Sequence, residues 1–129
     1  MLKINKDSKV APVGKFNDSI EYMPKSGMLG TQRVGSDRYT VICVSVDSPK
    51  RITVALLYDL DNINDIKSNK DIWVDEEGIM YMNGDDYKKY RPEISKWSLR
   101  KDRKWQEMKS RYRSTIQWGI ARPFQDLGF

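Results

Sequence analysis

The chain has 129 residues, 39% hydrophobic and 32% charged, a size and composition that fit one folded domain and exclude a disordered chain. Its formal net charge is +5, it has a single cysteine, Cys43, and it has no histidine. One cysteine excludes an intrachain disulfide. Without histidine the usual general base and zinc ligand are missing, so we expect no metal, no cofactor and no enzymatic activity.

No apolar stretch reaches the length of a membrane span, and residues 1–15 lack the hydrophobic core of a signal peptide. We therefore expect a cytoplasmic protein with no membrane partner. Cys43 lies inside an apolar run, which fits a buried thiol in a reducing compartment.

Residues 1–26 show neither a helical nor an alternating period, and we interpret them as an extended N-terminal arm. We expect residues 27–129 to form a single β domain. Glycines at 27, 30 and 35 open this domain and predict turns, or a close approach of the backbone to a ligand or another strand.

Several short strands follow. The β-branched runs 38–47 and 51–59 flank a short turn and predict an antiparallel hairpin, and both are apolar on two faces, as central strands are. Further hairpins are predicted for 72–82, turning at 75–78, and for 96–109, with a last strand within 114–122. Residues 60–69 fit either one short helix or an ordered loop.

This pattern predicts an all-β fold, or a mainly β fold with one short helix, built as a small, strongly bent antiparallel sheet or an SH3-like barrel. The tail 123–129 carries Phe124, Leu127 and Phe129. We expect the tail to act as a hydrophobic clasp over an open sheet edge or a neighbouring subunit.

Charge is unevenly distributed. Residues 100–113 contain seven cationic side chains and two acids, and seven minus two gives +5, the whole net charge. Besides Arg100, this basic patch consists of Lys101, Arg103, Lys104, Lys109, Arg111 and Arg113. Such a patch indicates an anionic partner.

Residues 59–77 carry seven acids and two lysines, a local charge of two minus seven, or -5. This acidic segment and the basic patch either attract each other within an assembly or form two solvated faces. The acidic segment lacks the glycine and glutamate spacing of an EF-hand, so we expect no calcium site.

Arginines near strand ends and aromatic rings are candidate ligand-binding groups, because guanidinium groups bind phosphate and rings stack on bases. Arg38 stands at the start of the first strong strand, and Arg122 follows the last one. Trp97 is a candidate stacking surface, although a small barrel also needs tryptophan to fill its interior. No P-loop or dinucleotide-binding glycine motif is present.

The order of several motifs resembles a widespread group of small phage-encoded proteins. The motifs are Gly-Met-x-Gly-Thr at 27–31, Ser-Asp-Arg before a β-branched strand at 36–44, the hairpin 97–105 with tryptophan at both ends, Gly119, and the terminal Phe129. The resemblance covers roughly residues 27–129. The chain departs from it at Asp102 and Arg103, where the group has Asn-Gly, and over 123–129, where the group is rich in tyrosine.

Within this group the chain looks similar to the Thoeris anti-defence protein 1 family, whose members are oligomers that bind cyclic ADP-ribose signals without cleaving them. The resemblance implies a homo-oligomeric phage counter-defence protein in the cytoplasm of the bacterial host, which sequesters a nucleotide-derived immune signal. It implies Arg38, Arg100 and Arg122 as ligand contacts, and we place Trp97 with them.

Two other classes stay open. An anti-CRISPR protein or similar inhibitor would use the basic patch to bind nucleic acid, a nuclease or another host defence protein. A virion or assembly component would use the tail and the two charged segments as assembly surfaces.

Overall fold

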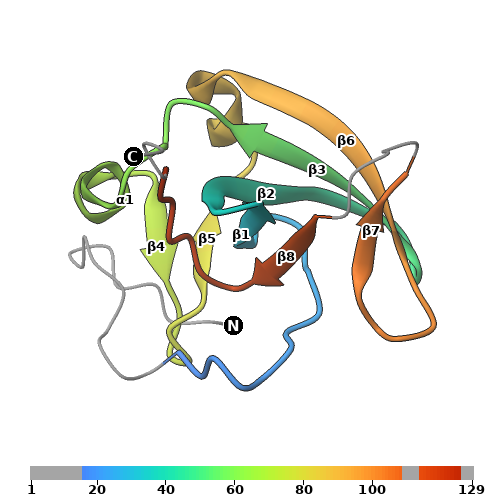
Figure 1. Cartoon of the computed structure of the whole chain (residues 1–129). Helices are drawn as coiled ribbons and strands as arrows, with labels where there is room; N and C mark the ends of the chain where they lie inside the picture. The colour runs from blue at the N-terminus through green and yellow to red at the C-terminus, as the bar shows by residue number, and fades with distance from the viewer. Residues whose placement is uncertain (1–15, 109–113, 126–129) are drawn as a thin grey trace.

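The computed structural model describes residues 16–108 and 114–125, and Figure 1 shows strands that curl into a barrel-like sheet beside one short helix. The elements are β1 (Leu29–Val34), β2 (Asp37–Ser48), β3 (Arg51–Leu57), α1 (Ile63–Ser68), β4 (Ile72–Val74), β5 (Met80–Met82), the 3-10 helix η1 (Asp86–Tyr90), β6 (Pro92–Leu99), β7 (Trp105–Glu107) and β8 (Thr115–Trp118).

Six antiparallel strands form the main sheet in the order β7-β6-β3-β2-β1-β8. The predicted hairpins β2-β3, β4-β5 and β6-β7 are confirmed, and of the two interpretations of residues 60–69 the structure shows the short helix. β2 and β3 are central, as their two apolar faces indicated. β1 was not predicted, because its glycines suggested turns.

The sheet bends until its two edge strands, β7 and β8, approach each other (Figure 1). No ladder pairs β7 with β8 within the described residues, so the barrel has a seam. The predicted fold class, a mainly β chain with a strongly bent sheet, is confirmed.

Alternate residues of β2 and β3 supply two hydrophobic clusters. The first lies inside the curl, where Trp97, Trp105 and Trp118 meet side chains from β2 and β3. The second is covered by α1 and the β4-β5 hairpin, which contribute Ile66 and Met80 among others. Asn62 caps α1 by accepting hydrogen bonds from two backbone amides of the first turn. Both faces of the central strands are therefore buried.

Both ends of the described chain pack on the sheet. Residues 16–26 contain no helix or strand, but Phe16 packs against both hydrophobic clusters. In the tail, Phe124 exchanges two backbone hydrogen bonds with Arg38 and so extends the pairing of β2, although its side chain is 55% exposed. Leu127 and Phe129 of the predicted clasp lie outside the described residues. Within 16–108 and 114–125, no helix has the length and apolar character to cross a membrane.

Candidate anion-binding groove

A groove of about 600 Å³ runs along the barrel seam. Its walls come from residues 18–23, from β1, from the loop joining β6 and β7, from β8, and from the segment after β8. Four cationic side chains line it, Arg33, Arg103, Lys104 and Arg122, against the two acids Asp18 and Glu21, so its lining has a net charge of four minus two, or +2. The seam therefore gathers positive charge from three distant parts of the sequence.

Aromatic and apolar side chains share this groove with the cations. Tyr22, Trp105 and Trp118 line it, and so do the exposed Ile20 and Met23. Trp118 is 3% exposed, and its indole Nε1 is a buried donor with no hydrogen-bond partner in the part of the chain that the structure describes. A ligand with both a flat ring and an anionic group would find partners of both kinds here.

Strand register places Arg38 beside Arg33, the arginine that β1 contributes to the groove. Arg33 lies opposite Thr115 of β8 and opposite Arg38 of β2, so the three side chains share one face of the sheet. Directly opposed like charges destabilise a sheet. Neither guanidinium has a hydrogen-bond or ion-pair partner among the described residues, so a bound anion would relieve this repulsion.

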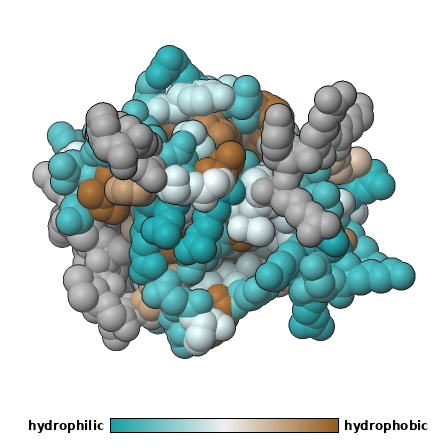
Figure 2. Space-filling view, viewed as in Figure 1, coloured by the Kyte–Doolittle hydropathy of each residue, from teal (hydrophilic) through white to brown (hydrophobic). Residues whose placement is uncertain are grey.

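The loop between β6 and β7 presents further cations. Arg100 and Lys104 close it, because the Arg100 amide donates to the Lys104 carbonyl at 2.9 Å. Arg103 within it has a φ of +66°, a left-handed conformation that glycine would adopt more easily. An arginine at this position keeps a cation beside the groove at a cost in backbone strain. Figure 2 shows hydrophilic side chains projecting at lower right, where Figure 1 places this loop.

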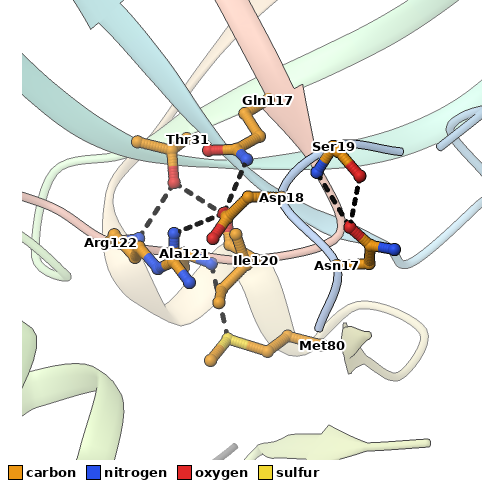
Figure 3. A network of polar contacts seen from close by, with 9 residues as sticks. All are labelled: Asn17, Asp18, Ser19, Thr31, Met80, Gln117, Ile120, Ala121 and Arg122. Atoms are coloured by element: carbon orange, nitrogen blue, oxygen red, sulfur yellow. Dashed lines mark hydrogen bonds and ion pairs between the residues drawn. The ribbon is translucent and has the colours of Figure 1, made fainter. Parts of the chain in front are cut away.

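Arg122 is held from two sides (Figure 3). Its backbone amide donates to Oγ1 of Thr31 at 2.9 Å, and that buried hydroxyl donates to the Ile120 carbonyl at 2.7 Å. Its Nη1 donates to Oδ1 of Asp18 at 2.7 Å, and Gln117 Nε2 donates to the same oxygen at 3.1 Å. These hydrogen bonds lower the pKa of Asp18 below its ordinary value, and the bond from Arg122 has the largest effect. Asp18 is therefore an anion at neutral pH.

The structure separates the residues that the sequence singled out. Arg122, Arg103 and Lys104 line the groove, whereas Arg38 lies one strand away beside Arg33, and Arg100 lies in the hairpin loop without lining the groove. Trp97 has no exposed surface, and its Nε1 donates to Ser95 Oγ at 2.8 Å, so it fills the barrel interior instead of offering a stacking face. Lys101 is exposed in the same loop. Lys109, Arg111 and Arg113 lie outside the described residues.

Three groove residues, Arg33, Gln117 and Asp18, were not predicted from the sequence. Arg33 follows two glycines that concealed β1, and Gln117 carries no charge to draw attention. Asp18 lies in the segment interpreted as an extended arm. The one available signal was the alternation in 114–122, which places Gln117 on the face opposite Ile116 and Trp118.

The described ion pairs of the acidic segment 59–77 join it to residues at the end of η1. Asp59 pairs with Arg91 at 2.7 Å, and Asp71 pairs with Lys89 at 3.4 Å and accepts a hydrogen bond from the Tyr90 hydroxyl. Its described ion pairs thus involve the end of η1 rather than the basic patch. Within the described ranges, no group of three or more acidic or cysteine side chains is arranged to hold a metal ion.

Fold and site together define a small barrel-like β protein with a basic, partly aromatic groove at its seam. No protein-family model, curated protein or solved structure matches the chain.

Proposed function

We propose that this protein binds a phosphate-bearing, nucleotide-type ligand in the seam groove and releases it unaltered. The observation that carries the proposal is the convergence of Arg33, Arg103, Lys104 and Arg122 on one groove that also contains the half-buried ring of Tyr22. Guanidinium groups supply forked hydrogen bonds to phosphate, and aromatic walls suit a base.

The resemblance to phage counter-defence proteins narrows the ligand to a cyclic ADP-ribose type signal, and the biological role to sequestration of that signal in the bacterial cytoplasm. A homo-oligomer fits this role, because copies could complete one another's grooves. We propose binding without catalysis, since sequestration needs only affinity.

Isothermal titration of the full chain with ADP-ribose, cyclic ADP-ribose isomers and cyclic oligonucleotides tests the proposal. We expect one of these ligands to bind and to be recovered intact after heat denaturation. Arg33→Ala and Arg122→Ala should each weaken binding about tenfold or more, as expected for a lost charge-assisted hydrogen bond. Arg51→Ala, an exposed arginine at the start of β3, is the matched control and should leave binding unchanged. Failure of every ligand to bind contradicts the proposal.

Nucleic-acid binding is the second candidate, and the exposed hairpin loop favours it. Arg100, Lys101, Arg103 and Lys104 are all exposed within five consecutive residues. A protein that neutralises several phosphates loses affinity steeply as salt rises, whereas a small ligand in a groove does so less. Binding of single- and double-stranded oligonucleotides at increasing salt separates the two candidates, and Lys101→Ala, outside the groove lining, should affect only nucleic-acid binding.

A further inference from the structure

One carboxylate oxygen already occupies the groove's best-defined anion position. Oδ1 of Asp18 accepts from Arg122 Nη1 at 2.7 Å and from Gln117 Nε2 at 3.1 Å (Figure 3). A phosphate oxygen accepts from the same kinds of donor at the same distances. The contact therefore outlines a place for an oxyanion on the groove wall.

The donors of this contact belong to the rigid part of the molecule. Gln117 lies on β8 opposite Thr31 of β1, and the backbone of Arg122 is fixed by its hydrogen bond to the buried Thr31 hydroxyl. The donor side chains thus extend from a backbone that the sheet holds in place.

The acceptor belongs to a segment that is not part of the sheet. Asp18 lies in a turn in which Oδ1 of Asn17 accepts from the amide and hydroxyl of Ser19, and residues 17–23 form no strand or helix. Phe16 anchors the start of this segment by packing into the two hydrophobic clusters, and the Arg122 guanidinium lies 5.6 Å from the centre of its ring. Asp18 is therefore held beside the groove by the packing of Phe16 and by the local turn, not by strand pairing.

The ion pair between Asp18 and Arg122 is also exposed to solvent, so a ligand can reach it. The side chains of Asp18 and Arg122 are 61% and 45% exposed, and ion pairs of this kind add little stability. A phosphate group carries more negative charge than a carboxylate and can replace it on the same donors.

From this geometry we infer that Arg122 and Gln117 form a phosphate subsite, and that Asp18 is a built-in competitor that fills the subsite until a ligand displaces it. The inference rests on the proposed function, since it assigns one phosphate of the proposed ligand to these two side chains. It adds Gln117 and Asp18 to the residues that set affinity.

Titration of Asp18→Asn with ADP-ribose, and separately with inorganic phosphate, at fixed ionic strength tests the inference. We expect both probes to bind about two- to fivefold more tightly than to the unaltered chain, because the competitor has lost its charge. Gln117→Leu should bind more weakly. The matched control is Glu21→Gln, which removes an equal charge from the groove lining at a side chain with no partner among the described residues. Thermal unfolding of each variant verifies that it is folded.

The outcomes separate this inference from the proposed function. Binding of ADP-ribose that is equally tight in Asp18→Asn and the unaltered chain, or equally improved by Glu21→Gln, overturns the inference and leaves the proposed function standing. If Asp18→Asn binds inorganic phosphate more tightly than the unaltered chain but no nucleotide binds, the subsite is supported and the proposed function is overturned. No binding of either probe to any variant overturns the inference, and the proposed function falls with it only if the cyclic ligands also fail to bind.

Discussion

The ring of Phe16 lies against the backbone of Gly119, where a Cβ atom would stand 2.7 Å from Cε1 of the ring. Gly119 follows β8 with a φ of +105°, which side chains rarely adopt. Its amide donates to the Leu29 carbonyl at 2.7 Å, and its carbonyl accepts from Met80 at 2.8 Å. Gly119 therefore links the N-terminal segment, the main sheet and the β4-β5 hairpin.

We expect Gly119→Ala to lower the free energy of unfolding by about 2–4 kcal/mol, from backbone strain together with the clash against Phe16. Urea denaturation measures this. Gly35→Ala is the matched control: Gly35 has a φ of +61°, but nothing lies within 4 Å of its added Cβ. It should cost about 1–2 kcal/mol from conformation alone. Equal losses for the two variants would show that the Phe16 contact has no energetic role.

A second prediction concerns two buried threonine hydroxyls in neighbouring strands. Thr40 on β2 is fully buried, and its Oγ1 has no hydrogen-bond partner within the described residues. Valine has the same shape without the polar atom, so Thr40→Val should raise the free energy of unfolding by about 1 kcal/mol. The comparison is Thr31→Val, which removes a hydroxyl that donates to Ile120 and accepts from Arg122. It should cost about 1–3 kcal/mol. A loss of stability in Thr40→Val would indicate that its hydroxyl has a partner.

Predictability from sequence followed the strength of the local pattern. β2 and β3 were predictable because β-branched residues fill both faces of each strand, and the β4-β5 and β6-β7 hairpins because polar turns separate their strands. β1 was not predictable, because Gly30 suggests a turn, whereas in the structure it lies within the strand and makes room for a neighbouring side chain. A Cβ at Gly30 would stand 2.9 Å from the Trp118 ring.

The site was harder to predict than the fold, because it depends on closure of the sheet. Arg103 and Lys104 could be named from their charge, and Arg122 from its position after the last strand. Arg122 is brought to the strand of Arg33 by the pairing of β1 with β8, and Arg103 and Lys104 join them only because β7 approaches β8 across the seam. Trp97 shows the opposite case. Its ring suggested a ligand contact, but its place on β6 turns it into the barrel interior.

Cys43 offers a third prediction. It is fully buried on β2, and burial, aided by the charge of Asp47, raises the pKa of its thiol to about 12. Because the thiolate is the reactive form, Ellman's reagent should not modify the folded protein at neutral pH. Modification should follow unfolding as denaturant is added. Rapid labelling of the folded protein would show that β2 opens locally.

The last prediction concerns acid stability and Asp47, at the end of β2. Its carboxylate accepts hydrogen bonds from Thr53 Oγ1 and Ser45 Oγ, each at 2.7 Å. These hydrogen bonds lower the pKa of Asp47 below its ordinary value, and the bond from Thr53 has the largest effect. As pH falls, the unfolded chain therefore takes up this proton first. The stabilisation is present above about pH 4 and is lost as pH falls through the folded pKa.

Asp47→Asn should accordingly reduce the dependence of the unfolding free energy on pH between about pH 5 and pH 2, as measured by urea denaturation across that range. The matched control is Asp61→Asn, at an exposed aspartate with no partner among the described residues, and it should keep the slope of the unaltered chain. An unchanged slope in Asp47→Asn would mean that the Thr53 and Ser45 hydrogen bonds do not favour the ionised carboxylate. In that case the acid sensitivity of the fold would have to come from other carboxylates, of which Asp18, held by Arg122, is the first to test.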